Sequence, residues 1–341
     1  MLEWPPEGAL LLGANGQGKT NVLEAVAYPA LFRSLRGAPD AELAAFGGSA
    51  FRVAVEASGA STLRLETAWH HAPRRKQVLV DGVPPEKLAD AVGRWLVVGF
   101  LPTDVALAAG GASQRRRYLD RMLSVADGRY LAALLAYRAA LAQRNAALRT
   151  RRADLAEAFD APLARAGAVI VARRVEWTRR SAERFATELT GLGESTESRL
   201  EYVGDAELAD PGAWGSALRR AGRHEAARGL TTVGPHRDDL RLVAGDRSLR
   251  TFGSSGQHRS AAVALRLLEL RTVREARGSE PALLLDDVYA ELDGARQERL
   301  TSRLAGEPCQ VFLTAPRREE APGSAHLAVF EVRAGAVRAL A

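Results

Sequence analysis

The chain has 341 residues, of which 47% are hydrophobic and 26% charged, so it is long enough for two domains and has an ordinary globular composition. These proportions exclude a disordered, collagenous or coiled-coil chain. No apolar run approaches the roughly 20 residues that a membrane-spanning helix needs, so we expect no membrane segment.

Net charge and cysteine content bear on the possible binding partners and on the cellular compartment. The net charge of +6 and the isoelectric point of about 9.9 permit a polyanionic partner. Almost all basic residues are arginine, however, and a GC-rich genome produces the same bias on any surface. Cys309 is the only cysteine, which rules out a disulfide within the chain. The N-terminus lacks the basic start and apolar stretch of a secretory signal, and we therefore expect a cytoplasmic protein.

The first third of the chain is predicted to be rich in β-structure. Short apolar or alternating runs bounded by turn residues indicate strands at residues 9–12, 51–57, 62–67, 77–80 and 95–100. From about residue 112 to residue 228 the spacing of apolar residues becomes helical, with breaks near residues 127–128, 160–162 and 191–193.

Strand patterns return in the last third of the chain, with helical stretches between them. The expected strands are residues 240–243, 282–285, 310–313 and 328–332, and the expected helices are residues 260–277 and 294–304. We therefore predict an α/β head built from residues 1–111 and 229–341, with residues 112–228 inserted as a helical arm.

The strongest single motif is a glycine-rich loop between an apolar run and a helical pattern. The run Gly13-Ala14-Asn15-Gly16-Gln17-Gly18-Lys19-Thr20 matches G-x-x-x-x-G-K-T. Its glycines let backbone N–H groups point at phosphates, and the helix start behind them favours negative charge. We expect Lys19 to contact the β- and γ-phosphates of ATP and Thr20 to place its hydroxyl on Mg²⁺. An ordinary glycine-rich turn is the alternative.

A second motif is a buried strand that ends in two carboxylates. The apolar residues 283–285 are followed by Asp286 and Asp287. We expect Asp286 to hold Mg²⁺ and Asp287 to orient or deprotonate the attacking water, so that Lys19 and Asp287 carry the catalysis. A buried strand ending in an acidic turn is common, and this motif gains weight only beside the glycine-rich loop.

The length of chain between these motifs discriminates among P-loop enzymes. The whole predicted arm lies between Lys19 and Asp286. The two motifs are therefore separated by far more residues than a small kinase or GTPase needs between its P-loop and its acidic strand. A nucleotide-binding head interrupted by a helical arm is the plan of the SMC-type branch of ABC ATPases. That branch requires a signature motif, and the run Ser254-Ser255-Gly256-Gln257 resembles the ABC signature S-x-G-Q.

The signature candidate has a functional and a structural interpretation. A serine hydroxyl and free N–H groups at a helix start form an anion site, which in this fold faces the γ-phosphate held by a partner subunit. We therefore expect Ser254, Gly256 and Gln257 to bind nucleotide across an ATP-dependent homodimer. An ordinary helix cap is the alternative.

Two further positions match the ABC plan less closely. Residues 290–293, directly after the acidic pair, resemble the D-loop that runs along an ABC dimer interface. Thr314 follows a predicted strand at the place where many ABC ATPases carry a switch histidine.

Several motifs together make the chain similar to the RecF family, in the order in which that family carries them. The matching runs are residues 15–21 with 23–25, Arg115-Arg116-Arg117-Tyr118-Leu119-Asp120, Gln143-Arg144-Asn145-Ala146, Gly234-Pro235-His236-Arg237-Asp238-Asp239-Leu240 and Ser255-Gly256-Gln257-His258-Arg259-Ser260. General ABC ATPases lack the run at residues 234–239, which makes it the most specific of these. The similarity covers nearly the whole chain.

The resemblance implies a function that composition and spacing do not. It implies a recombination mediator in DNA repair and replication restart: a weak ATPase with ATP and Mg²⁺ as cofactors, whose ATP-dependent homodimer binds double-stranded DNA and gap junctions. RecR and RecO are the implied partners in loading RecA at single-strand gaps. The arm would then form part of a DNA-binding cleft.

The sequence departs from the family pattern in places. Only twelve residues precede Gly13, so we expect an edge strand and part of the adenine pocket to be absent. The family's Pro-Glu-Asp near the nucleotide is Pro102-Thr103-Asp104 here, and Asp104 would act without its acidic neighbour.

Two motifs of the resemblance remain open to different interpretations. His236, Asp238 and Asp239 could be metal ligands, although polar contacts within the head are the simpler explanation. The run Gln143-Arg144-Asn145 is expected on a solvated helix face, with DNA contact as the alternative.

Other classes of protein remain as competitors. The main alternative is another SMC-like or ABC-type ATPase that is not specific for DNA, although the arm is short and no Cys-x-x-Cys hook is present. The ATP subunit of a transporter would need a much shorter insertion, and a small-molecule phosphotransferase would have no signature motif.

Overall fold

The computed structural model describes residues 2–58, 62–290 and 292–340 of the chain. By their internal contacts these residues form two compact units. Unit 1 comprises Met1–Asp104, Gly191–Gly193 and Leu265–Ala341, and unit 2 comprises Val105–Thr190 and Glu194–Ala264. Unit 1 is therefore assembled from both ends of the chain.

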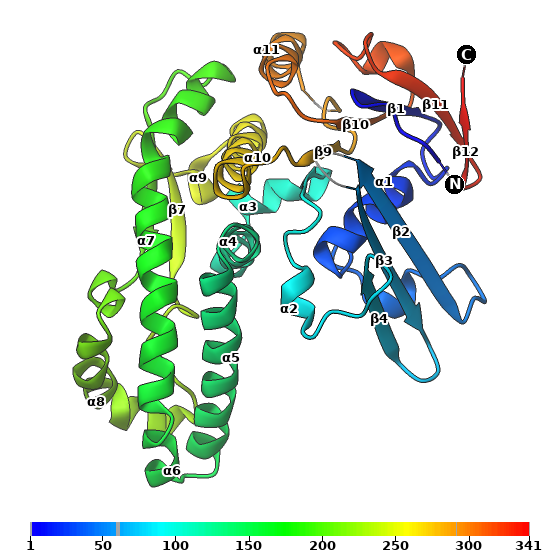
Figure 1. Ribbon diagram of the computed structural model, residues 1–341. Coiled ribbons are helices and arrows are strands. Elements are labelled where there is room, and N and C mark those ends of the chain that lie inside the picture. Colours follow the sequence, from blue (N-terminus) through cyan, green and yellow to red (C-terminus); the bar gives the residue numbers. More distant parts are fainter. Residues whose placement is uncertain (1, 59–61, 291, 341) are drawn as a thin grey trace. The chain divides into compact units, whose positions relative to one another are not determined.

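Unit 1 is built on a six-stranded sheet with the strand order β12-β11-β1-β10-β9-β5 (Figure 1). All neighbouring strands are parallel except β12, which runs antiparallel to β11. The strands are β1 (Gly8–Leu12), β5 (Val97–Phe100), β9 (Ala282–Leu285), β10 (Val311–Ala315), β11 (Ala328–Arg333) and β12 (Ala336–Ala339). The three central strands β1, β10 and β9 are mostly buried, which explains their unbroken apolar sequences.

A second, antiparallel sheet in unit 1 is a meander of three strands. It contains β2 (Ala50–Ser58), β3 (Thr62–His70) and β4 (Arg75–Val80). Burial alternates along β2 between exposed and half-buried residues, as expected for a strand with one solvated face. The remaining elements of unit 1 are α1 (Lys19–Leu31), η1 (Asp40–Glu42), α2 (Leu88–Ala91), α11 (Gly294–Ala305) and η4 (Arg318–Glu320).

The core of unit 1 lies between α1 and the large sheet. Leu23 and Ala27 of α1 pack with Leu11, Leu284 and Phe312 of the strands, all of them almost completely buried. Helix α1 therefore covers one face of the sheet and is fixed at the end of β1.

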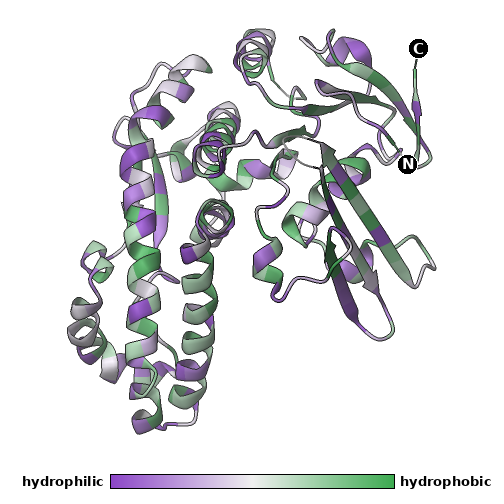
Figure 2. Ribbon diagram, viewed as in Figure 1, coloured by the Kyte–Doolittle hydropathy of each residue, from purple (hydrophilic) through white to green (hydrophobic). Residues whose placement is uncertain are grey.

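Unit 2 is mainly helical, and Figure 2 shows hydrophilic and hydrophobic residues interleaved along its longest helix, α7. Its helices are α3 (Ala106–Ala109), α4 (Ala112–Ala126), α5 (Gly128–Arg149), α6 (Ala153–Glu157), α7 (Asp160–Gly191), α8 (Pro211–Arg228) and α9 (Leu249–Phe252), with the short turn η3 (Ala206–Ala209). The short turn η2 (Pro102–Val105) begins in unit 1 and ends at the first residue of unit 2. Helix α10 (Ser255–Arg277) begins in unit 2 and continues into unit 1.

Unit 2 also contains a small antiparallel sheet, of which only the strand at residues 240–243 was predicted. Strand β6 (Ser198–Val203) pairs with β7 (Asp239–Ala244), which in turn pairs with β8 (Arg247–Ser248). Because β6 lies inside the expected arm and β7 lies beyond it, their pairing draws residues after 228 into the same compact unit. The unit therefore extends to Ala264, past the expected boundary.

Arg144 is buried, contrary to the expectation of a solvated helix face. Its guanidinium contacts Asp160 at 2.7 Å, the fully buried Glu225 at 2.6 Å and the hydroxyl of Thr231 at 2.9 Å. The neighbouring Asn145 accepts a hydrogen bond from the backbone N–H of Thr231. Arg144 therefore joins α5, the start of α7, α8 and the segment after α8, and its carboxylate partners compensate the burial of its charge.

No helix in the part of the chain that the structure describes is long and apolar enough to cross a membrane.

Arg144→Ala should destabilise the protein strongly, because it leaves the buried carboxylate of Glu225 without its partner. Loss of one member of a buried ion pair costs about 3–5 kcal/mol. Urea unfolding followed by circular dichroism measures the effect, with exposed Arg129→Ala on the same helix as the control. Equal unfolding midpoints for the two variants would contradict the assigned role of Arg144.

Candidate nucleotide-binding site

The glycine-rich loop of unit 1 connects β1 to α1 and is braced by two neighbouring strands. The N–H of Gly13 donates to the carbonyl of Ala315 at 3.3 Å, and a Cβ at Gly13 would lie only 2.3 Å from the carbonyl oxygen of Val332. Gly18 caps α1 with a φ of 103°, a conformation that glycine adopts without strain. The loop therefore requires glycine where the backbone approaches other strands or turns into the helix.

Lys19 lies at the start of α1 and is almost completely buried. Its ammonium group donates to the carbonyl of Gly13 at 2.6 Å and to that of Ala14 at 3.3 Å. The same loop is fixed from outside by Gln17, whose side-chain oxygen accepts from the N–H of Ala334 and whose carbonyl accepts from the N–H of Gly335. A helix N-terminus with a buried ammonium beside it is a ready-made anion site.

The glycine-rich loop and the acidic pair come together from opposite ends of the chain. The hydroxyl of Thr20 lies 3.1 and 2.9 Å from the two carboxylate oxygens of Asp286. Thr314 of β10 donates to Asp286 at 2.9 Å, and its oxygen accepts from the N–H of Asp287 at the same distance. A threonine hydroxyl beside a carboxylate is a fitting pair of oxygen ligands for Mg²⁺. The structure therefore brings together Lys19, Thr20, Asp286 and Asp287.

Burial raises the pKa of the Asp286 carboxyl above its ordinary value of 3.8. The hydroxyl donors Thr314 and Thr20 act in the opposite direction, and the charge of Asp287 raises the pKa further. The ionised form of Asp286 is therefore disfavoured in the folded protein without a cation, as expected for a carboxylate placed to receive one.

A cavity of about 250 Å³ opens beside Asp287. Asp287, Thr314 and Gln297 are among the residues that line it. Asp287 has a left-handed backbone with a φ of 45°, which is uncommon outside glycine and is held here by the hydrogen bond from its N–H to Thr314. Asp287, next to Asp286 in the sequence, thus lines an open space in which a water molecule has room.

Sequence reasoning missed a buried carboxylate on α1. Glu24 accepts from the hydroxyl of Ser34, from the N–H of Leu35 at 3.0 Å and from Arg36 at 2.6 Å. Arg36 also donates to Asn21, one residue after Thr20. These contacts fix the segment after α1 against the helix. In the sequence, Glu24 belongs to the run 23–25 that carries the family resemblance, but no role was assigned to it.

The signature candidate lies at the start of α10 and forms a reciprocal cap. The hydroxyl of Ser254 accepts from the N–H of Gln257 at 3.2 Å, and the side chain of Gln257 accepts from the N–H of Ser254 at 3.0 Å. This is the arrangement of a capping box. The cap is present, and a nucleotide contact by Ser254, Gly256 and Gln257 stays a prediction.

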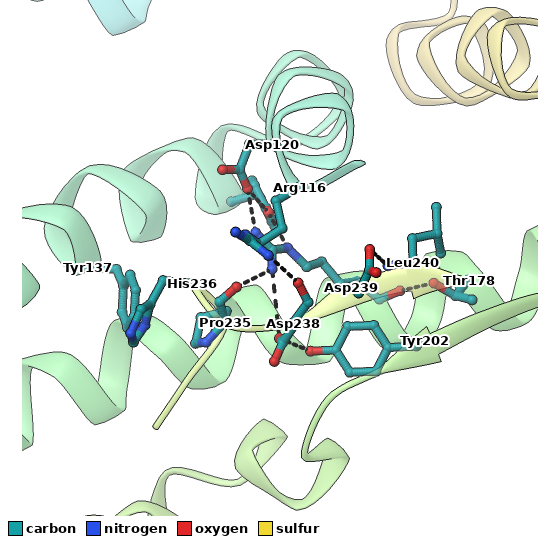
Figure 3. Close-up of polar contacts among 12 residues, drawn as sticks. Arg116, Asp120, Tyr137, Thr178, Tyr202, Pro235, His236, Asp238, Asp239 and Leu240 are labelled. Atoms are coloured by element: carbon teal, nitrogen blue, oxygen red, sulfur yellow. Dashed lines mark hydrogen bonds and ion pairs between the residues drawn. The ribbon is translucent and has the colours of Figure 1, made fainter. Parts of the chain in front are cut away.

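The run at residues 234–240 forms buried polar contacts in unit 2 (Figure 3). Arg174 donates to the carbonyl of Pro235 at 2.7 Å and to Asp120 at 2.8 Å. Asp238 accepts from the hydroxyl of Tyr202, and the guanidinium of Arg174 lies 3.7 Å from it. Burial raises the pKa of Asp238. The run therefore anchors a strand to surrounding helices.

The same run does not form a metal site. The ring of His236 accepts from Tyr137 at its Nδ1 atom and donates from Nε2 to the carbonyl of Thr231, so both nitrogens are occupied. Asp239 pairs with both guanidinium ends of Arg115, at 2.7 and 2.8 Å. No group of three or more metal-ligating side chains occurs within residues 2–58, 62–290 and 292–340. The simpler expectation of polar contacts holds, although in unit 2.

Two further candidates from the sequence are Asp104 and the D-loop run at residues 290–293. Asp104 is buried and accepts from two guanidinium nitrogens of Arg266, Nε and Nη2, and from the N–H of Leu101. Its contacts are therefore those of a structural ion pair. In the D-loop candidate, Glu291 lies outside the described residues, and Asp293 caps α11 by accepting from the N–H of Arg296.

The parallel sheet, the glycine-rich loop and the neighbouring acidic pair give unit 1 the α/β fold of a P-loop nucleotide-binding head of the ABC type. The curated "DNA replication and repair protein RecF" of Anaeromyxobacter sp. strain Fw109-5 is 38% identical over 98% of this chain and 94% of its own length. The RecF of Herpetosiphon aurantiacus is 35% identical over 92% and 88%. The chain therefore belongs to the RecF family.

Solved structures agree with this assignment. The solved structure of the recombination mediator protein RecF with ATP in the RecFOR pathway matches 100% of this chain and 93% of its own chain. The corresponding structure with ATPrS matches 100% of this chain and 94% of its own. Their TM-scores are 0.90 and 0.85, with identities of 30% and 31%. A Pyrococcus furiosus Smc head domain shares the fold at 15% identity over 99% of this chain and 91% of its own, with a TM-score of 0.58. No protein-family model matches the chain.

Asp286→Asn should raise the melting temperature of the nucleotide-free protein at pH 7 and abolish any Mg²⁺-dependent stabilisation by ATP. The raised pKa means that the ionised carboxyl costs folding free energy at neutral pH. Each kcal/mol of relief would shift the midpoint by roughly 2–4 °C in a domain of about 150–250 residues. The difference from wild type should shrink as the pH falls through the pKa of Asp286.

Asp293→Asn is the matched control for this measurement by differential scanning calorimetry. The N–H of Arg296 lowers the pKa of Asp293, so the ionised form is favoured there and its loss should not stabilise. A lower midpoint for Asp286→Asn than for wild type at pH 7 would contradict the assigned electrostatics.

Proposed function

We propose that this chain is an ATP-dependent DNA-binding recombination mediator of the RecF type. It binds ATP with Mg²⁺, dimerises on ATP, hydrolyses it slowly as a conformational switch, and helps to load RecA at single-strand gaps. The observation that carries this proposal is the contact of Thr20 with Asp286, which joins a P-loop to an acidic strand in a chain whose relatives include RecF with ATP. Repair, replication and recombination of DNA are its cellular context.

The roles of the P-loop follow from its chemistry. The N–H groups of the loop from Gly13 to Thr20 would cradle the phosphates, and Lys19 would leave the carbonyls of Gly13 and Ala14 for the β- and γ-phosphates. Thr20 and Asp286 would hold Mg²⁺, which supplies neutralisation of phosphate charge. Because their oxygens already lie within hydrogen-bond distance of each other, little rearrangement is needed.

Asp287 is the proposed base or orienting group for the attacking water. Its pairing with Thr314 links it to the same β10 residue that contacts Asp286, so the two carboxylates are positioned together. Thr314 replaces the switch histidine of many ABC ATPases, and it offers a single hydroxyl proton and no titration near neutral pH. Slow hydrolysis, suited to timing, agrees with this replacement.

The proposed partners follow from the family. The RecFOR pathway of the solved relatives supports RecR and RecO as protein partners. Double-stranded DNA and gap junctions are the proposed nucleic-acid partners. The helix start with Ser254 would complete the nucleotide site of a second copy of the chain, since a capped helix N-terminus also offers free N–H groups.

ATP with Mg²⁺ should tighten binding of gapped duplex DNA, measured by fluorescence anisotropy across a salt series. The logarithm of the binding constant should fall linearly with the logarithm of salt concentration. Lys19→Ala should lose the ATP effect, whereas Asp287→Asn should keep it and lose hydrolysis. Binding that is absent at low salt, or turnover by Asp287→Asn at the wild-type rate, would overturn the corresponding assignment.

A second experiment addresses the shared site. Ser254→Arg should bind ATP but remain monomeric, because a bulky cation replaces a small donor at a close contact, and Lys19→Ala should fail to bind ATP. A mixture of the two variants contains heterodimers with one intact composite site, so sedimentation should detect partial recovery of ATP-dependent dimers. Ser302→Arg, on the exposed surface of α11, is the control and should dimerise like wild type. If Ser254→Arg dimerises normally, Ser254 is only a helix cap.

A further inference from the structure

Helix α8 of unit 2 carries a basic surface that the nucleotide site does not use. Its exposed positions include four arginines and one histidine at helical spacing. We call this surface the basic stripe; it consists of Arg219, Arg220, Arg223, His224 and Arg228. Residues four apart on a helix lie on one face, so 219 with 223, 220 with 224 and 224 with 228 form one continuous surface. Figure 1 shows where α8 lies within unit 2.

The opposite face of α8 is fixed in the core of unit 2. Trp214 and Leu218 are almost completely buried, and the indole N–H of Trp214 donates to the carbonyl of Leu208 at 2.8 Å. The only acidic residue of the helix, Glu225, is fully buried with Arg144 and accepts from the N–H of Thr232 at 2.5 Å. The helix is therefore held rigidly, and no carboxylate of its own reaches the exposed side.

Within the part of the chain that the structure describes, the arginines of the stripe have no ion-pair partner. Within the stripe, Arg228 contacts the ring of His224 at 3.2 Å. Exposed Arg149 of α5 lies beside Gly229, directly after α8, where a Cβ would lie 3.3 Å from its Cγ. The positive surface therefore continues from α8 onto a second helix.

The arginine bias of the whole chain does not explain the stripe. The chain has 47 basic and 41 acidic residues, so an average exposed helix face carries both signs. Helix α11 does so, since Glu298 and Arg299 are both exposed on it. A stretch of ten residues with four exposed arginines and no exposed acid is therefore a local departure.

Local helix energetics do not explain the stripe either. A cation at the C-terminus of a helix is favoured by the helix dipole, which accounts for Arg228. Arg219 and Arg220 lie in the middle of the helix, where the dipole gives no such benefit, and the like charges of Arg219 and Arg223 at i and i+4 oppose helix formation. A charge arrangement that is locally unfavourable and has no partner among the described residues is expected at a binding surface.

We infer that the basic stripe of α8 binds the phosphate backbone of duplex DNA. This rests on the proposed DNA-binding function and names a surface for it. From residue 219 to residue 228 the stripe spans roughly 14 Å at 1.5 Å per residue. B-form DNA carries about eight phosphate charges over that length of its axis. Guanidinium groups on a rigid helix suit phosphates, and contacts of this kind give affinity without sequence preference.

The test compares two doubly substituted full-length chains with wild type. Arg219→Gln with Arg223→Gln removes two charges from the stripe, and Arg129→Gln with Arg179→Gln removes two exposed arginines from α5 and α7. Glutamine is a good helix former, so neither pair should disturb the fold. Anisotropy with a labelled blunt duplex of random sequence, from low to moderate salt, gives the affinity and its salt slope.

The stripe variant should bind the duplex about 10–30-fold more weakly near 0.15 M salt, with a salt slope reduced by about two, because each lost phosphate contact removes about 0.9. The control should keep the wild-type slope. The melting temperature of the control should equal that of wild type. The melting temperature of the stripe variant should be equal to that of wild type or higher, because like charges are removed from one helix.

Outcomes separate this inference from the proposed function. If wild type binds the duplex with a steep salt dependence and the stripe variant matches it, the stripe does not bind DNA and only this inference falls. If both double variants lose slope equally, the effect is that of net charge and the inference is again overturned. If wild type itself does not bind DNA at low salt, the proposed function fails.

Discussion

The site depends on the parallel pairing of three central strands from opposite ends of the chain. Strand β1 pairs with β10, so that Leu12 lies opposite Ala315, and β10 pairs with β9, so that Leu313 lies opposite Leu285. Parallel strands in register end at the same edge of the sheet, which is where the P-loop leaves β1 and Asp286 follows β9. The contact of Thr20 with Asp286 is a consequence of that register. A one-residue slip would turn the side chains of a strand to the opposite face.

Thr314 connects the strand register to the positions of the two carboxylates. It belongs to β10, between the strand that precedes the P-loop and the strand that precedes the acidic pair. Its hydroxyl has one proton to donate, and Asp286 at 2.9 Å is a nearer acceptor than Asp287 at 3.4 Å. The oxygen is then free to accept from the N–H of Asp287, which fixes the left-handed backbone there. One small side chain thus orients two carboxylates, a role that a sequence comparison with a switch histidine does not reveal.

Short sequence patterns were sufficient to predict the strands that precede the glycine-rich loop and the acidic pair. The apolar run before the glycine-rich loop and the run of leucines before Asp286 are short, unbroken and bounded by turn residues, and both are strands. Strand β6 was missed because its partner β7 lies about 40 residues away, and its own sequence contains as many polar as apolar residues. The burial of Arg144 could not be predicted, since its carboxylate partners come from two other helices. Asp104 was placed by analogy, and its contact with Arg266 spans 162 positions of the sequence.

Arginine illustrates why composition alone is a poor guide to function in this chain. Arg144 and Arg174 are almost completely buried, and carboxylates, a tyrosine hydroxyl or backbone carbonyls occupy their donors. Neither can reach a phosphate without dismantling unit 2. The arginines of the basic stripe differ from these two in their surroundings. The one carboxylate of their helix, Glu225, pairs with Arg144 on the buried face. Since burying Glu225 with Arg144 leaves the exposed face of α8 uniformly positive, the same ion pair that stabilises the helix also shapes the charge of its outer surface.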